Sequence, residues 1–233
     1  MISFVVPAYN EESYLPSTLE AIHASARALG EPYEIVVADD ASTDSTADVA
    51  REMGARVVRV EYRQIAATRN AGARAARGEL LVFVDADTRV NAPLVAGAVA
   101  ALHAGAVGGG APVRIEPAPA WVRAFMALCF TPFYFRLARW AAGCFVFCTR
   151  EAFDAVGGFD ERYYASEEIA FSKAVKRVGR FAMMKNYVVT SPRKLEGRSA
   201  LDVFALVMRL AAGGRAGLMR RTGATAFWYP ERR

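Results

Sequence analysis

Two carboxylates follow an apolar run near the middle of the sequence, and their spacing makes them the residues best suited to do chemistry. Leu80–Val84 has the composition of a buried strand, and Asp85 and Asp87 come directly after it. Residues two apart on an extended chain point to the same side, so both carboxylates face one way. Such a pair is unfavourable unless a positive charge lies between them. A divalent cation carrying a phosphorylated ligand meets that need, so the pair indicates a site for a nucleotide diphosphate.

Acidic side chains also follow two earlier apolar runs. The turn 10–12 follows the run 2–7, and Asp39 and Asp40 follow the run 34–38. The carboxyl ends of parallel strands meet at one edge of a sheet, so we expect these side chains to gather there with the Asp-x-Asp pair. Helix capping is the alternative role for Asp39 and Asp40. For the Asp-x-Asp pair, the alternative is an ordinary polar transition from strand to loop.

The elements that must position these residues alternate regularly through the first hundred residues. Apolar runs typical of strands alternate with segments of helical apolar spacing. The expected strands are 2–7, 34–38, 56–60 and 80–84, and the expected helices are 13–29, 42–53, 65–76 and 92–103. This order predicts an α/β fold with a Rossmann-like, mostly parallel central sheet flanked by helices.

The pattern changes after residue 104. Gly108–Gly110 indicates a break in the alternation of strands and helices. Ser166 is expected to cap a later helix. The further expected elements are a strand at 113–115, an apolar helix at 121–140 interrupted near Pro132, a buried strand at 144–148, a turn at 157–160, and helices at 166–178 and 200–219. We expect one domain, residues 1–233, made of a first half (1–104) that carries the Asp-x-Asp pair, a second half (105–190) and a basic tail (191–233).

Composition fits a folded protein whose charge is unevenly distributed. The chain has 233 residues, of which 54% are hydrophobic and 23% charged, enough for a sizeable core. Residues 1–172 carry a net charge of −6, whereas residues 173–233 carry +11. The basic end suggests an anionic partner, either a phosphate or an anionic membrane surface, and its alternative is a solvated basic face. The sequence contains no motif for nucleic-acid binding, so we expect no nucleic-acid partner.

The sequence suggests a cytoplasmic protein, either free or peripheral on the inner face of the membrane. The most apolar stretch, 124–135, is shorter than the ~20 residues that a spanning helix needs. The first residues read as a strand instead of a leader peptide. In the basic tail, Arg193 and Lys194 would contact the phosphates of a bound nucleotide diphosphate if the segment folds back as a lid. The alternatives are a helix around 209–221 lying on an anionic membrane, or a solvated tail.

Six short stretches, taken in order, resemble the inverting glycosyltransferases of family 2, which have the GT-A fold. The resemblance covers about residues 1–190 and depends on the order and spacing of the stretches, since each alone is weak. The stretches are Val5-Val-Pro7-Ala8-Tyr9-Asn10-Glu11-Glu12, Val37-Ala-Asp39-Asp40-Ala-Ser42-Thr43-Asp44, Ala67-Thr-Arg69-Asn70-Ala-Gly72, Val84-Asp85-Ala86-Asp87, Val156-Gly157-Gly158-Phe159-Asp160 and Glu167-Glu168.

The resemblance implies that residues 1–104 bind the nucleotide-sugar donor and the metal and that residues 105–190 bind the acceptor. It also implies a role for each matching position. The residues it assigns to the nucleotide-sugar donor are Pro7, Ala8, Tyr9 and Glu11 in the first loop, Asp39 or Asp40 at the base, Arg69 at the base or a phosphate, and Asp85-Ala86-Asp87 at the diphosphate. Asp85 and Asp87 would bind Mn²⁺ or Mg²⁺, with Asp87 as the more direct ligand. From the residues alone, Arg69 reads as a surface charge on a helix.

The pair Glu167-Glu168 departs from the family pattern, which has Glu-Asp at this place. The resemblance assigns the catalytic base to the second position, here Glu168, with Glu167 as the reserve. The extra methylene of a glutamate must then be accommodated, and a shift of about 1 Å in such a group can matter greatly. Two acids in the first turn of a helix are also favourable without any catalytic role.

The implied reaction is metal-dependent transfer of a sugar, with inversion, from a UDP-, GDP- or dTDP-sugar. The acceptor would be a hydroxyl of a sugar or small molecule, or a lipid-linked group such as a lipid phosphate. One alternative is a nucleotide-sugar-binding subunit without turnover, which the Glu-Glu pair favours. The other is a sugar nucleotidyltransferase, which usually needs a glycine-rich loop where this chain has Pro7-Ala-Tyr-Asn-Glu-Glu.

Overall fold

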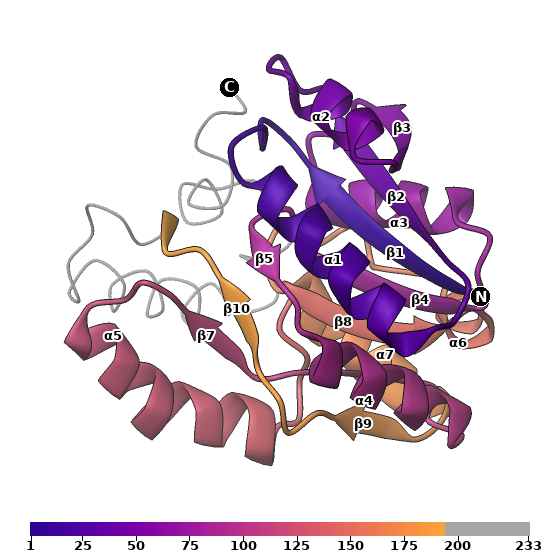
Figure 1. Cartoon of the computed structure of the whole chain (residues 1–233). Helices are drawn as coiled ribbons and strands as arrows, with labels where there is room; N and C mark the ends of the chain where they lie inside the picture. The colour runs from indigo at the N-terminus through magenta and orange to yellow at the C-terminus, as the bar shows by residue number, and fades with distance from the viewer. Residues whose placement is uncertain (194–233) are drawn as a thin grey trace.

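A seven-stranded sheet in the order β3-β2-β1-β4-β8-β6-β9 forms the centre of the molecule (Figure 1). The computed structural model describes residues 1–193. The strands of this sheet are β1 (Ile2–Ala8), β2 (Tyr33–Asp40), β3 (Arg56–Val60), β4 (Leu80–Val84), β6 (Gly108–Gly110), β8 (Phe145–Thr149) and β9 (Phe181–Met183). All four strands expected in the first hundred residues are present, within two or three residues of their expected bounds.

The first four strands form a continuous parallel block. β1 lies between β2 and β4 and is parallel to both, while β3 extends the sheet beyond β2. On the other side of β4, β8 runs antiparallel to both β4 and β6. The expectation of a mostly parallel sheet is therefore confirmed. Its consequence is that β1, β2 and β4 end at the same edge, where Ala8 pairs with Asp39.

Helices cover both faces of the sheet, as the alternation predicted. Helices α1 (Leu15–Leu29) and α4 (Ala92–His103) bury Leu19 and Leu94 in the core on one face. On the other face, α3 (Ile65–Ala75), α6 (Arg150–Val156) and α7 (Glu167–Val178) bury Ala66, Phe153 and Phe171. The remaining helix of the first half is α2 (Thr46–Glu52). Apolar side chains face the sheet from both sides, so the sheet itself is the core.

A small second sheet brings the end of the described chain to the edge where β4 ends. It consists of β5 (Thr88–Arg89), β10 (Val188–Thr190) and β7 (Val113–Ile115). β10 lies between the other two, antiparallel to β5 and parallel to β7. The N–H of Ser191 then donates to the carbonyl of Asp87 at 3.2 Å. Residues 188–193 therefore lie beside the Asp-x-Asp turn, although they are a hundred residues away in sequence.

The expectation that Gly108–Gly110 interrupt the regular secondary structure is wrong, because these residues form strand β6. A Cβ at Gly109 would lie 2.1 Å from the carbonyl oxygen of Ala182 and 2.3 Å from the ring of Phe147. A Cβ at Gly110 would lie 2.4 Å from that of Ala141. The glycines are therefore needed for the close approach of neighbouring chain segments, and no turn requires them here.

The expected interruption near Pro132 is also wrong. Helix α5 (Ala120–Phe125) continues without a break into the π-helix η1 (Met126–Leu137), which contains Pro132 (Figure 1). At its end, the N–H of Ala138 donates to the carbonyl of Phe133, five residues earlier, at 2.9 Å. A proline ring clashes with the carbonyl four residues before it in an α-helix, and the wider π turn relieves that clash. Neither this helix nor any other within residues 1–193 is both long and apolar enough to cross a membrane.

We predict that Gly109→Ala lowers the free energy of unfolding by at least about 2 kcal/mol, because the added methyl overpacks a site bounded by backbone. Gly97→Ala in α4 is the matched control. Its Cβ would meet only the sulfur of Met184 at 3.4 Å, so it should be neutral or stabilising by up to about 1 kcal/mol. Urea unfolding followed by circular dichroism measures both. Equal stabilities for the two variants would contradict the packing assigned to β6.

Candidate active site

The loops after β1 and β2 are locked together by hydrogen bonds. The N–H of Asn10 donates to the hydroxyl of Ser42 at 3.0 Å, and the N–H of Thr43 donates to the side-chain oxygen of Asn10 at 2.8 Å. The N–H of Glu11 donates to Thr46 at 2.7 Å. These bonds keep residues 42–45 out of the helix, which explains why α2 begins at Thr46 and not at residue 42. Of the residues expected in this loop, Pro7 and Ala8 are buried at the end of β1 and Tyr9 is half-buried.

Asp39 and Asp40 have different surroundings, although both are buried. Asp39 accepts a hydrogen bond from the N–H of Ser42 at 3.2 Å and pairs with Arg59 at 3.3 Å. Asp40 accepts from several backbone N–H groups of residues 62–64 and from the hydroxyl of Thr68 at 3.0 Å. Asp40 therefore holds the turn that leads into α3. Of the two, Asp39 has fewer protein partners and is the better candidate for a contact with a base.

The carboxylates of the Asp-x-Asp turn bond to different partners. Asp85 accepts from Nη2 of Arg69 at 2.7 Å, and its carbonyl accepts from the N–H of Thr88, which closes the turn. Asp87 lies near the hydroxyls of Thr88 and Thr190, at 3.4 and 3.3 Å. Ala86 between them is buried, and its carbonyl accepts from the hydroxyl of Thr18.

Arg193 connects the first loop to this turn. Its guanidinium donates to both oxygens of Glu11, at 2.9 and 2.6 Å, and lies 3.8 Å from Oδ2 of Asp87. It also lies over the ring of Tyr14, 5.1 Å from the centroid. The structure thus brings Arg193 to the expected metal-binding pair, while Lys194 and the rest of the tail lie outside the described residues. A cation at this position can meet the phosphates of a donor.

Arg69 is buried, so its reading as a surface charge is wrong. Its side chain is only 2% exposed, and its guanidinium donates to Glu167 at 2.5 Å, to Asp85 at 2.7 Å and to the carbonyl of Gly143 at 2.9 Å. Burial alone would lower the pKa of Arg69, but the two carboxylates outweigh it and raise that pKa above its ordinary value. Its contacts with the protein join the end of β4 to the start of α7, and a direct donor contact stays a prediction.

Two amides of α3 position the segment before α7, and motif reading did not assign them a role. Asn70 donates to the carbonyl of Phe159 and accepts from its N–H, both at 2.8 Å. Gln64 donates to the carbonyl of Tyr163 at 2.9 Å. Gly158, in the expected turn, has φ +76° and leaves no room for a Cβ, which would lie 2.6 Å from Asn70. The amides therefore fix the loop that carries the Glu-Glu pair.

The two glutamates at the start of α7 are in distinct environments. Glu167 is buried and paired with Arg69. Glu168 is half-buried, and Oε1 accepts a hydrogen bond from the hydroxyl of Tyr134 at 3.0 Å. Burial and the neighbouring charge of Glu167 raise the pKa of Glu168 to about 7. A carboxylate with this pKa can accept and release a proton near neutral pH.

Tyr134 comes from η1 and could not be found from sequence, because nothing in the apolar segment distinguishes it. Its hydroxyl lies 3.1 Å from the carbonyl of Ala141 as well as 3.0 Å from Glu168. Burial and the charge of Glu168 raise the pKa of Tyr134 well above its ordinary value, so the hydroxyl stays protonated and remains a donor.

Ser166 occupies the N-cap position of α7, but its side chain does not cap the helix as expected. Instead, its carbonyl accepts from the N–H of Ile169 at 3.1 Å. Its φ of +63° is unusual for a residue other than glycine. Such strained residues often lie at functional sites, and this one immediately precedes the two glutamates.

The residues present fit a divalent cation bound together with a phosphorylated ligand. Asp85 and Asp87 offer hard oxygen donors on one turn, and both side chains are partly accessible. Within residues 1–193 there is no group of three or more His, Cys, Asp or Glu side chains that could hold a metal by themselves. Mg²⁺ is commonly bound by one or two carboxylates plus substrate phosphates and water, which matches this donor set.

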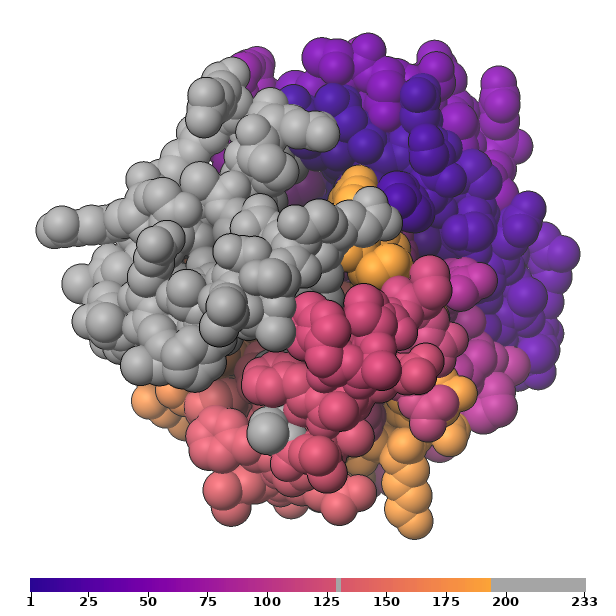
Figure 2. Space-filling view, turned by 90° about the vertical axis from the view of Figure 1, so that its left-hand side faces the viewer, coloured from indigo at the N-terminus to yellow at the C-terminus, as the bar shows by residue number. Residues whose placement is uncertain are grey.

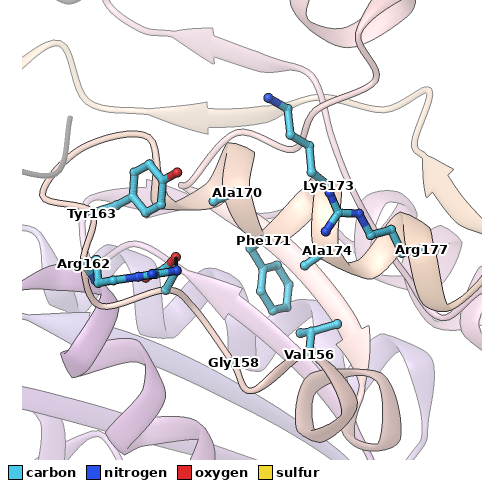
Figure 3. A pocket seen from close by; sticks show the side chains of 10 residues that line it. Val156, Gly158, Arg162, Tyr163, Ala170, Phe171, Lys173, Ala174 and Arg177 are labelled. Carbon is cyan, nitrogen blue, oxygen red and sulfur yellow. Dashed lines mark hydrogen bonds and ion pairs between the residues drawn. The ribbon is translucent and has the colours of Figure 1, made fainter. Parts of the chain in front are cut away.

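A cavity of about 440 Å³ lies between α7, the end of α6 and residues 158–163 (Figure 3). Its lining includes Gly158, Tyr163, Phe171, Lys173 and Arg177. None of the residues expected to bind donor or metal, and neither glutamate, lines it. The chemistry of the carboxylates therefore identifies the site better than the size of the hollow does.

We predict that Arg69→Met lowers the free energy of unfolding by about 3–5 kcal/mol, because it leaves Asp85 and Glu167 without their shared cation. Arg74→Met, on the same helix, is the matched control. Its side chain is 59% exposed and lies 4.0 Å from Glu161, so the change should stay within about 0.5 kcal/mol. Urea unfolding measures both. Similar losses in the two variants would contradict the role given to Arg69.

Comparison with known proteins places this chain in a family. The family model described as glycosyl transferase family 2 matches residues 3–157, more than half of the chain. The chain is similar to validoxylamine A glucosyltransferase of Streptomyces hygroscopicus subsp. jinggangensis, with 38% identity over 45% of this chain and 26% of the relative. It is also similar to undecaprenyl-phosphate 4-deoxy-4-formamido-L-arabinose transferase of Pseudomonas paraeruginosa, with 41% identity over 37% of this chain and 28% of the relative. The chain thus spans about a quarter of the length of these curated relatives.

A solved structure supports the fold independently. The mannosyltransferase PcManGT from Pyrobaculum calidifontis, in complex with GDP-Man and Mn²⁺, matches with a TM-score of 0.69 and 24% identity, covering 88% of this chain and 60% of that one. The GT-A fold that the resemblance implied is therefore confirmed. Together with the extent of the family match, this means that the chain belongs to glycosyl transferase family 2.

Proposed function

We propose that this chain is a metal-dependent inverting glycosyltransferase that moves a sugar from a nucleotide-diphosphate donor to an acceptor hydroxyl. The observation that carries the proposal is the environment of Glu168. This carboxylate is half-buried, its pKa is raised to about 7, and Tyr134 orients it. It lies close to Arg69, since a Cβ at Gly143 would be within 3.7 Å of Glu168 and 3.3 Å of the guanidinium that binds Asp85.

The proposed mechanism assigns a task to each group. Asp39 contacts the base of the donor, and Arg193 meets the diphosphate beside Asp87. Asp85 and Asp87 would hold Mn²⁺ or Mg²⁺, which when bound would supply positive charge to stabilise the departing diphosphate. Glu168 takes the proton from the acceptor hydroxyl as the oxygen of that hydroxyl attacks the anomeric carbon, and a single displacement inverts the configuration.

Several observations on other proteins support this proposal without fixing the substrates. The relatives are named as a glucosyltransferase and as a transferase acting on undecaprenyl phosphate, and the structural neighbour was solved with GDP-Man and Mn²⁺. A lipid phosphate is therefore the second candidate acceptor. A phosphate is already ionised near pH 7, so it would depend little on a base. The half-buried Glu168 favours the hydroxyl, and the chain would work at the inner surface of the membrane if that hydroxyl is lipid-linked.

Glu168→Gln should lower kcat by about 10² to 10⁴-fold with a hydroxyl acceptor, because the amide cannot take the proton. Donor binding, measured by calorimetry with Mn²⁺ and a panel of UDP-, GDP- and dTDP-sugars, should be unchanged. Glu151→Gln, exposed at the start of α6, is the matched control and should behave as the wild type. Full turnover by Glu168→Gln would show that Glu168 is not the catalytic base. Absence of turnover in the wild type with every donor would favour a binding subunit.

The pH dependence gives an independent test. Because the base must be ionised, kcat/KM should rise as the pH increases through about 7, the pKa of Glu168. The Tyr134 hydroxyl stabilises the ionised form, so Tyr134→Phe should raise this pKa and move the rising limb to higher pH. Tyr187→Phe removes a hydroxyl from the ring that packs under Arg114, just before β10, and should leave the limb in place. If the rising limb of kcat/KM does not move in Tyr134→Phe, the Tyr134 hydroxyl does not stabilise the ionised form of the catalytic base.

A further inference from the structure

The outer side of the helix formed by α5 and η1 carries a concentration of exposed apolar side chains. Among the side chains that the structure describes, which exclude those of residues 129 and 130, half of the exposed large apolar residues lie on this one helix. They are Phe125 (41% exposed), Leu128 (77%), Phe133 (57%) and Leu137 (76%). Figure 2 shows the pink surface of this helix on the side turned to the viewer. Soluble surfaces usually expose such residues singly, and a contiguous group marks an interaction surface.

The π-helical geometry is what aligns them. Leu128, Phe133 and Leu137 are five and four residues apart, and in an α-helix this spacing would spread them around the axis. The wider turn of a π-helix, with hydrogen bonds from residue i to i+5, puts them on one side. Tyr134 and Phe135 point inward and are buried. The helix therefore has one face toward the protein and one apolar face toward the outside.

The charged residues of the segment that forms this face are all positive. Residues 117–150 contain no Asp or Glu, whereas Arg123, Arg136 and Arg139 lie on or next to the helix. Arg123 and Arg136 are exposed. A symmetric contact with a second copy would set these arginines against one another. Residues 194–233 carry a net charge of +5 and so would also be repelled. An anionic partner with an apolar interior is complementary to the face.

We propose that this face docks on an anionic lipid bilayer. Leu128, Phe133 and Leu137 enter the boundary between headgroups and acyl chains, and Arg123 and Arg136 contact the lipid phosphates. Docking in this way does not require any catalytic activity.

Docking would also connect the membrane to the active site. Tyr134, on the inner side of the same helix, bonds to Glu168 at 3.0 Å. A hydroxyl carried on a lipid-linked acceptor would therefore arrive beside the base from the bilayer side. This second step rests on the proposed function, whereas the docking step stands without it.

The test is flotation of the full chain with vesicles, without donor or metal. Wild-type protein should float with vesicles of phosphatidylcholine and phosphatidylglycerol and remain at the bottom with phosphatidylcholine alone. Leu128→Glu combined with Leu137→Glu should reduce the floated fraction at least about tenfold, because it replaces inserted apolar groups with charges of the same sign as the lipid. Val178→Glu, at an exposed apolar residue at the end of α7, is the matched control and should float as the wild type.

Three outcomes would overturn the proposal. The first is a wild type that fails to float with anionic vesicles. The second is a double variant that floats as well as the wild type, which would place binding elsewhere in the chain. The third is a dimer in light scattering that the double variant dissociates, without flotation of either protein, which would make the face a contact between copies. Circular dichroism checks that the double variant is folded. Because flotation is measured without donor, its result stands whether or not sugar transfer is observed.

Discussion

The buried guanidinium of Arg69 is the interaction on which the rest of the site depends. It bonds to Asp85 at the end of β4, to Glu167 at the start of α7 and to the carbonyl of Gly143 before β8. The buried Glu167 and the partly buried Asp85 would be unfavourable without a cation, and a buried arginine without carboxylates equally so. The three charges therefore require one another, and the segments that carry them must meet. Gly72 permits this, because a Cβ there would lie 2.5 Å from Val5 and would push α3 away from the sheet.

The same ion pair explains why two adjacent glutamates can have different roles. Arg69 bonds to Glu167 and not to Glu168, which fixes the Glu167 carboxylate beside its neighbour. Burial and the charge of that neighbour together raise the pKa of Glu168 to about 7. A carboxyl group whose environment raises its pKa in this way is typical of acid–base sites. A glutamate in place of the family's aspartate is thus compatible with a base, since the local electrostatics, and not the side-chain type alone, set its proton affinity.

The sequence could predict the parts of the fold that depend on local pattern. Apolar runs alternating with helical spacing identified β1 to β4 and their helices, because the residues of each segment carry its apolar pattern by themselves. It could not predict β6 or β10, which exist only through pairing with distant strands, and a row of three glycines carries no strand signal of its own. The burial of Arg69 and the role of Tyr134 escaped for a related reason. The roles of Arg69 and Tyr134 depend on contacts with Glu167 and Glu168, which are distant in sequence and come close only in the folded chain.

Two cations flank the Asp-x-Asp turn, and the difference between them bears on how a donor would bind. Arg69 is itself buried and holds Asp85 at 2.7 Å. Arg193 lies 3.8 Å from Asp87, is 35% exposed and is bonded mainly to Glu11. The charge on Asp85 is therefore already balanced by a fixed partner, whereas Asp87 has only a distant and replaceable one. A cation that arrives with the donor gains most by binding Asp87, and a donor phosphate can take the place of Glu11 as the partner of Arg193. This asymmetry favours Asp87 as the more direct metal ligand, on electrostatic grounds that are independent of any family likeness.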